Sequence, residues 1–210
     1  EAWLRLGEYR FDLGQYDASI EAYQQALKVE QGKYFEMALY KLAWSYFQKY
    51  DYPTAIETFK RLIAHIDGAK GKGGLGTQLR SEAVEYLGVS LADDDWNGDG
   101  EPDPNATVGR ALGFLSSGQA FEREVMERYA DTLFAEHEVR KYPMAIEAYR
   151  AVIARDPLNP SNAALKEKII GVYDTLQDTE RMTAERQDMV KNFGPGSAWY
   201  ETNKNRPEVL

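Results

Sequence analysis

Cysteine is absent from the 210 residues, which excludes disulfides, thiolate metal sites and a cysteine nucleophile. Histidine is scarce: His65 and His137 are the two in the chain, and we expect surface or helix-terminal roles for both rather than catalysis. No apolar run is long enough to cross a bilayer, so we expect no direct membrane insertion. Positive charge is also in deficit, because the net charge is −9. An acidic chain argues against a nucleic-acid partner, which would require a basic face.

Signatures of common enzymes are missing as well. No nucleophile elbow, phosphate-binding loop or dinucleotide fingerprint occurs, and the glycine-rich stretch 71–76 follows no expected strand. We therefore expect no enzyme activity. The chain also lacks an initiator methionine and begins within a helix-like pattern. We interpret it as a fragment of a longer protein whose targeting signal lies elsewhere.

What the chain does contain is a folded composition, with 43% hydrophobic and 12% aromatic residues. One short pattern also recurs along it. The first copy begins at Trp3-x-x-Leu6-Gly7 and continues through residues 14–27, and the second covers residues 39–59. A third, partial copy covers residues 142–149 and ends at Asp156-Pro157. Apolar residues within each copy follow the helical period, so the copies predict amphipathic helices.

This pattern resembles the tetratricopeptide repeat, a pair of antiparallel helices of about 34 residues. The resemblance implies an all-α, right-handed superhelical solenoid of about five helix pairs. We expect Gly7 with Ser19, and Ala43 with Ala55, to lie where paired helices approach closely. The predicted organisation is pairs 1 and 2 over 1–67, a Gly-rich linker over 68–77, pair 3 over 78–117, pair 4 over 118–157, pair 5 over 158–193, and a tail over 194–210 leading to further sequence.

An acidic loop at 93–105 interrupts the third pair. Its sequence is similar to a calcium loop of the EF-hand, dockerin or thrombospondin kind, which needs oxygen ligands at alternate positions and a sharp turn. The resemblance implies Ca²⁺ as a cofactor, with Gly100 at the turn and Ala106 in place of the usual bidentate glutamate. The candidate ligands are Asp95, Asn97, Asp99, Glu101 through its carbonyl, and Asp103. The alternative is an acidic surface turn that binds no metal.

The tetratricopeptide resemblance also implies a protein-binding groove formed by the first helix of each pair. The candidate groove residues are Arg5, Glu8, Asp12, Met37, Tyr40, Lys41, Trp44, Gln48 and Tyr86. Tyr40 and Trp44 lie one turn apart, and exposed aromatic residues often anchor partners. The alternative for Trp44 is packing against the Gly-rich linker or the acidic loop. Glu8 and Trp44 occupy positions where the family's carboxylate clamp needs asparagine, so we do not expect that clamp.

The resemblance thus favours a non-catalytic scaffold that binds a protein or peptide partner. Two alternatives stay open: a structural spacer that only sets distance, and a regulatory module of a larger enzyme. Residues 194–200 are similar to segments of large tetratricopeptide proteins of gliding and predatory delta-proteobacteria. That similarity, together with a structural calcium site, implies a periplasmic or cell-envelope location and a role in an envelope process such as motility.

Overall fold

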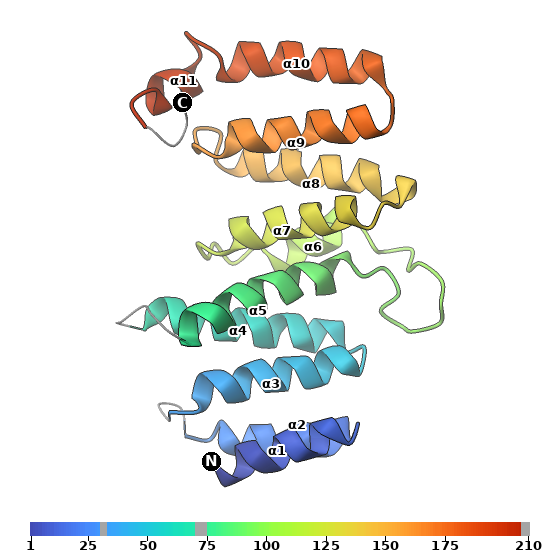
Figure 1. Cartoon of the computed structure of the whole chain (residues 1–210), viewed down its shortest axis with the longest axis vertical. Helices are drawn as coiled ribbons and strands as arrows, with labels where there is room; N and C mark the ends of the chain where they lie inside the picture. Colours follow the sequence, from blue (N-terminus) through green and yellow to red (C-terminus); the bar gives the residue numbers. More distant parts are fainter. Residues whose placement is uncertain (30–32, 70–74, 207–210) are drawn as a thin grey trace. The chain divides into compact units, whose positions relative to one another are not determined.

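The computed structural model describes residues 1–29, 33–69 and 75–206. The chain divides into two compact units, Glu1–Tyr129 and Ala130–Leu210, and each is described by itself below. Helix is the sole regular secondary structure in the described ranges (Figure 1), so the predicted all-α class is confirmed.

The first unit holds helices that pack in sequence order. They are α1 (Ala2–Asp12), α2 (Tyr16–Ala26), α3 (Phe35–Gln48), α4 (Tyr52–Gly68), α5 (Leu75–Ala92), α6 (Val108–Phe114) and the first part of α7 (Glu122–Ala135). From α1 to α5, each helix packs mainly on the one before it and the one after it (Figure 1). Packing between sequence neighbours is the arrangement expected of a repeat array, in which each unit buries its apolar face against the next.

Small residues allow the close helix contacts that the sequence predicts. A Cβ atom on Gly7 of α1 would lie 2.4 Å from the ring of Tyr23 on α2, so this position has room for hydrogen alone. Ser19 is fully buried, and its hydroxyl lies 2.9 Å from the hydroxyl of Ser45, which joins α2 to α3. Ala43 and Ala55 are both fully buried, as expected of residues between packed helices.

The second helix of a pair begins in the same way in both units. The residue just before the N-cap has a positive φ at Gly14, Tyr50 and Gln177, with values of 70°, 60° and 56°. The N-cap residues Asp51 and Asp178 then accept hydrogen bonds from backbone amides three residues further on. The second helix of the pair at 162–193 therefore begins with the same turn as α2 and α4, although its sequence matches the repeat pattern weakly.

The second unit contains the rest of α7 and a shorter series of helices. They are the 3-10 turn η1 (Val139–Lys141), α8 (Tyr142–Arg155), α9 (Asn162–Thr175), α10 (Thr179–Phe193) and α11 (Ala198–Asn203). Helix α8 packs on α9, α9 on α10, and α10 on α11 (Figure 1). Helix α10 has Glu185 as its one buried residue, so polar contacts contribute much of its attachment.

Two boundaries differ from the sequence-based expectations. Helix α4 continues to Gly68 and α5 begins at Leu75, so helix occupies both ends of the predicted linker, whose centre at 70–74 lies outside the described residues. The tail at 194–210 contains α11, to which the sequence pattern assigned no element. Ser197 caps this helix by accepting a hydrogen bond from the Tyr200 amide at 3.1 Å, and Trp199 is buried against the preceding chain.

Candidate functional site

Three side chains from two helices form what we call the aromatic surface: Tyr40 and Trp44 of α3 and Tyr86 of α5. The ring centroids of Trp44 and Tyr86 lie 4.2 Å apart in an edge-to-face contact, and those of Tyr40 and Trp44 lie 6.3 Å apart. All three residues are partly exposed. Edge-to-face pairs stabilise aromatic clusters beyond the area that they bury. The surface is therefore both held in place and open to solvent.

Hydrogen bonding fixes one edge of the aromatic surface. The Tyr40 hydroxyl donates to the Glu82 carboxylate of α5. Burial, followed by the bond to Glu82, raises the pKa of Tyr40 to about 12. The same bond, together with one from Gln78, lowers the pKa of Glu82. The phenol therefore stays protonated and the carboxylate ionised at neutral pH, which maintains the link between α3 and α5.

The other predicted groove residues lie on α1 and α3. On α3, Met37 and Lys41 are partly exposed and Gln48 is exposed. On α1, Arg5 pairs with Glu8 at 3.0 Å, and Asp12 is exposed. Within the described residues, no hydrogen bond or ring contact joins these α1 side chains to the aromatic surface. The structure therefore brings together the aromatic members of the predicted set, while the groove as a whole stays a prediction.

The rings of Phe47 and Tyr86 pack against Trp44, and among the described residues no hydrogen bond or ring contact joins Trp44 to the acidic loop. Packing of Trp44 against the Gly-rich linker stays a prediction, because the centre of that segment lies outside the described residues. The tryptophan that fixes the loop is Trp96. Its ring packs beside Phe114, its indole NH donates to the Ser90 carbonyl at 3.0 Å, and the guanidinium of Arg110 lies 3.7 Å from its ring centroid.

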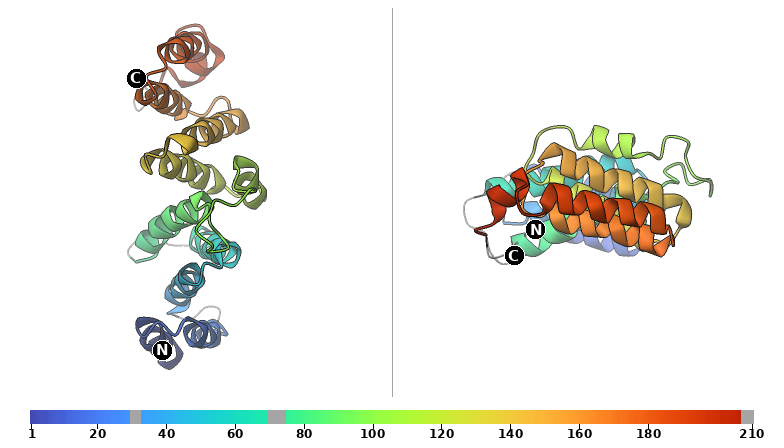
Figure 2. Two further views of the ribbon diagram at one scale, coloured as in Figure 1. Left: turned by 90° about the vertical axis from the view of Figure 1, so that its right-hand side faces the viewer. Right: turned by 90° about the horizontal axis from the view of Figure 1, so that it is seen from above.

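Arg110 anchors the loop from α6. Its guanidinium donates to the Asp93 carbonyl at 2.6 Å and lies 3.7 Å from the Asp103 carboxylate. Burial lowers the pKa of Arg110, whereas Asp103 acts in the opposite direction. Figures 1 and 2 show the long connection between α5 and α6 that these contacts hold at both ends. Sequence analysis missed this anchor, although a tryptophan within a polar loop is a signal of a buried contact.

The acidic loop turns where the sequence predicts. Gly100 has a φ of 87°, which favours glycine. The Asp95 carboxylate accepts hydrogen bonds from the amides of Asp99 at 3.0 Å and Gly100 at 2.8 Å. The Asn97 side-chain oxygen accepts a second bond from the Asp99 amide at 2.8 Å. The loop therefore curls around its own polar side chains.

The remaining predicted ligands, Asp103 and Glu101, differ in their surroundings. The Asp103 carboxylate accepts from the Trp96 amide at 2.9 Å and from the Asn97 side chain at 3.2 Å, while Glu101 is exposed. Within the described ranges, no three histidine, aspartate or glutamate side chains are grouped closely enough to hold a metal ion. The turn thus fits a calcium loop, but the side chains as folded do not converge on one point.

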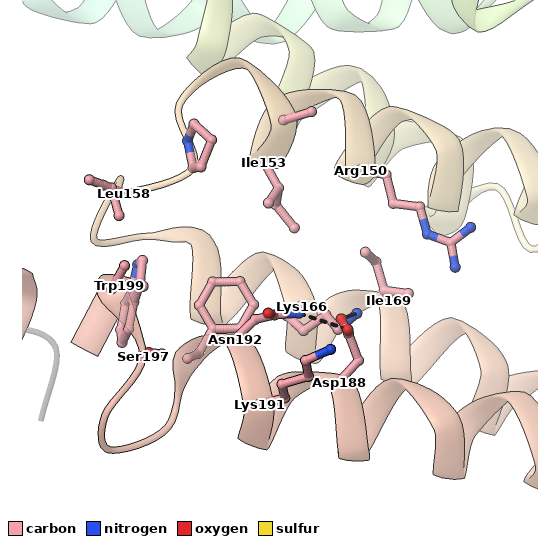
Figure 3. Close-up of a pocket in the computed structure, with 14 residues that line it drawn as sticks. Arg150, Ile153, Leu158, Lys166, Ile169, Asp188, Lys191, Asn192, Ser197 and Trp199 are labelled. Atoms are coloured by element: carbon pink, nitrogen blue, oxygen red, sulfur yellow. Dashed lines mark hydrogen bonds and ion pairs between the residues drawn. The ribbon is translucent and has the colours of Figure 1, made fainter. Parts of the chain in front are cut away.

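The second unit contains a pocket that sequence analysis did not identify. Figure 3 shows it between α8 and α10, with α9 behind it and Trp199 at one end. Its volume is about 590 Å³. Most of its walls are apolar, and charged groups lie on one side. The lining consists of Arg150, Ile153, Ala154, Pro157, Leu158, Lys166, Ile169, Asp188, Lys191, Asn192, Phe193, Ser197, Ala198 and Trp199.

A set of ion pairs lies on the charged side of this pocket. The buried Glu185 accepts hydrogen bonds from Arg150 of α8 and Lys166 of α9, and Lys166 also reaches Asp188 at 2.5 Å. Burial alone would raise the pKa of Glu185, but the bonds from Lys166 and Arg150 lower it below its ordinary value of 4.5. Glu185 is therefore ionised at neutral pH and links three helices.

The comparisons with known proteins agree with the repeat pattern over part of the chain. A family model described as tetratricopeptide repeat matches residues 4–70. No curated protein matches the chain. Among solved structures, a MamA protein is similar at 17% identity and a TM-score of 0.40, covering 100% of this chain and 96% of the other.

Two further structures have the same level of similarity. One is a putative kinesin light chain of Podospora anserina with nearly identical TPR-like repeats, at 15% identity and a TM-score of 0.40, covering 90% and 92% of the two chains. The other is the TPR2AB domain of yeast Sti1 in a complex with pHSP90, at 16% identity and a TM-score of 0.38, covering 90% and 76%. These low scores establish no relationship on their own.

The assignment accordingly depends on the helices of the chain itself and on the matched segment. Residues 4–70 correspond to α1–α4, which contain the close contact at Gly7 and the buried Ala43 and Ala55. Over this segment, the chain matches the family model of the tetratricopeptide repeat.

Proposed function

We propose that this protein is a non-catalytic scaffold that binds a protein or peptide partner across α3 and α5. The observation that carries the proposal is the aromatic surface of Tyr40, Trp44 and Tyr86, which is partly exposed on a helical repeat array. Stacked repeats present extended surfaces for partners, and aromatic side chains are the commonest binding anchors.

The local energetics of the aromatic surface support this role. Trp44 is held by contacts to Phe47 and Tyr86, so it loses little conformational freedom when a partner covers it. Lys41 follows Tyr40 on the same helix and is partly exposed, so it adds a cation that an acidic partner group could meet. Binding would then combine burial of aromatic area with one charge contact.

The alternative function as a structural spacer predicts a different environment for these residues. A spacer needs buried contacts between repeats and has no use for a partly exposed Trp44. The third reading, a regulatory module of a larger enzyme, is compatible with the same surface, since such a module also acts by binding. The aromatic surface therefore favours binding over spacing without separating a scaffold from a regulatory module.

We also propose a weak structural calcium site in the loop at 93–105. The support is the turn at Gly100 and the two side-chain oxygens, one of Asp95 and one of Asn97, that share the Asp99 amide. Each carboxylate oxygen has two lone pairs, so an oxygen that accepts an amide hydrogen can still coordinate an ion. Open sites of this kind need about 10⁻⁴ to 10⁻³ M calcium, which suits the periplasm or the outer face of a cell envelope.

Affinity capture followed by hydrogen exchange tests the binding proposal. The wild-type chain and a Trp44→Ala variant are immobilised, and proteins retained by the wild type alone are identified by quantitative mass spectrometry. Trp3→Ala is the matched control, because Trp3 is 50% exposed on α1 and, among the described residues, makes no ring contact with the aromatic surface. We expect capture to depend on Trp44 and not on Trp3, with slower amide exchange in α3 and α5 of the complex. Identical capture by all three proteins would refute the proposed site.

A further inference from the structure

The pocket in the second unit has the dimensions of a binding site. Its volume of about 590 Å³ lies within the range of ligand-sized clefts, roughly 300–1,000 Å³. Ile153 and Leu158 line it from α8 and the following loop, and Trp199 closes one end (Figure 3). Such a space accepts one or two bulky apolar side chains.

The carboxylates around the pocket are paired with cations, whereas one of the cations there has no partner among the described residues. Asp188 is neutralised by Lys166 at 2.5 Å and accepts a further bond from Asn192 at 2.7 Å. Glu185, three residues before Asp188 on α10, is paired with both Lys166 and Arg150. Lys191 is exposed and, among the described residues, makes no hydrogen bond or ion pair. The acidic groups at the pocket are thus neutralised, and one cation is left.

A second cation, Arg150, is also partly exposed at the pocket, although its charge is paired. The Arg150 side chain is 54% exposed although it pairs with Glu185, so part of the guanidinium still faces solvent at the opposite end from Trp199 (Figure 3). The pocket therefore presents positive charge to solvent in a chain whose net charge is −9. A ligand that brings carboxylates gains attraction here, whereas a basic ligand meets uncompensated like charge.

We propose that this pocket is a second peptide-binding site, which takes a segment with a bulky apolar side chain next to an acidic residue. The apolar side chain enters between Ile153, Leu158 and Trp199, and the neighbouring carboxylate pairs with Lys191 at the rim. This inference rests on the proposed function as a binding scaffold but adds a site in the other unit, with its own ligand chemistry.

Selection from a displayed library of random twelve-residue peptides tests the proposal on the intact chain. Three variants sort the selected peptides. Lys191→Glu reverses the rim charge, and Arg186→Glu is its matched control because Arg186 is exposed on the same helix and does not line the pocket. Leu158→Asp places a charge in the apolar wall at a residue that is 45% exposed, so folding should survive, and circular dichroism checks this.

The expected result is enrichment of peptides that carry Asp or Glu within two positions of Leu, Ile, Phe or Trp. Their affinity, measured by fluorescence anisotropy, should fall about tenfold or more in Lys191→Glu and in Leu158→Asp, and should change less than about twofold in Arg186→Glu. Added salt should weaken binding to the wild type. Trp44→Ala should leave these peptides unaffected, so failure of the aromatic surface and failure of this pocket are separable.

Three results would overturn the proposal. One is a lack of enrichment over an unrelated protein. Another is a set of peptides that bind Leu158→Asp or Lys191→Glu as well as the wild type. The third is a set that depends on Trp44 alone, which would place peptide binding on the aromatic surface and leave the pocket without a ligand.

Discussion

The guanidinium of Arg110, in the first turn of α6, lies 3.7 Å from the ring centroid of Trp96 in the loop that follows α5. This cation–π contact joins the two ends of a long acidic loop whose composition alone would leave it poorly ordered. The same arginine donates to the Asp93 carbonyl at the end of α5. The loop therefore has a fixed base whether or not its tip binds an ion.

Removal of the Trp96 ring should loosen this base. Trp96→Ala deletes contacts to Phe114 and Arg110 and an indole hydrogen bond, so we expect the free energy of unfolding to fall by about 2–3 kcal/mol. Arg110→Lys keeps the charge but loses the flat stacking surface and should cost about 1 kcal/mol. Urea denaturation measures both values. An unchanged midpoint for Trp96→Ala would mean that the loop is attached in another way.

Two glycine substitutions should have opposite effects on stability. Gly7→Ala places a methyl group 2.4 Å from the Tyr23 ring, and the resulting overpacking should cost about 1–3 kcal/mol. Gly113→Ala in α6 meets no atom within 4 Å and should gain up to about 1 kcal/mol from helix propensity. Thermal melting of the two variants checks the signs. If Gly113→Ala lowered the melting temperature and Gly7→Ala left it unchanged, the close helix contact assigned to Gly7 would be wrong.

Calcium should stabilise the protein if the acidic loop binds it. Binding to the native state alone raises the melting temperature by mass action, so millimolar Ca²⁺ should raise it and EDTA should lower it. Asp99→Ala should abolish the difference. Glu101→Gln is the control, because the expected ligand there is the backbone carbonyl. Mg²⁺ should substitute poorly, since it requires a tighter octahedron. Calorimetry that detects no calcium binding at millimolar concentration would leave the acidic-turn interpretation.

Acidification should weaken the attachment of α10. The folded-state pKa of Glu185 lies below its ordinary value of 4.5, because Lys166 and Arg150 favour the ionised form despite burial. A depressed carboxylate pKa contributes stability that is present above pH 4.5 and is lost as the pH falls through the folded-state value. Glu185→Gln should lower stability at pH 7 and flatten this acid-side dependence. Denaturant midpoints between pH 3 and pH 7 would show it, and parallel curves for both proteins would contradict the assignment.

The sequence predicted the helices well where packing follows the repeat pattern. Gly7 marks a close contact, since a Cβ atom there would meet the Tyr23 ring, and Ser19 is buried and bonds to Ser45 of the next pair. The sequence predicted the turn at Gly100 for a similar reason, since few other residues adopt a positive φ. Features that depend on distant partners were harder to predict. The roles of Trp96 and Arg110 depend on a contact between separate elements, and a single sequence contains no record of it.

The two proposed binding sites also combine features that the sequence predicts with features that it does not. Helical spacing placed Tyr40 beside Trp44, but nothing local indicated that Tyr86 would pack against Trp44 from α5. The pocket beside Trp199 was missed because it is formed by four helices, and its charged side depends on Glu185, a residue type that rarely predicts burial.

The most direct test of the account is calorimetric titration of Trp44→Ala and Trp3→Ala with a partner that the wild type retains. Both variants remove a partly exposed tryptophan, and only the first touches the aromatic surface. The account predicts that Trp44→Ala weakens binding by more than about 2 kcal/mol, roughly thirtyfold in Kd, while Trp3→Ala leaves Kd unchanged. Equal affinities for the two variants, with Trp44→Ala folded by circular dichroism, would contradict it and favour the spacer interpretation.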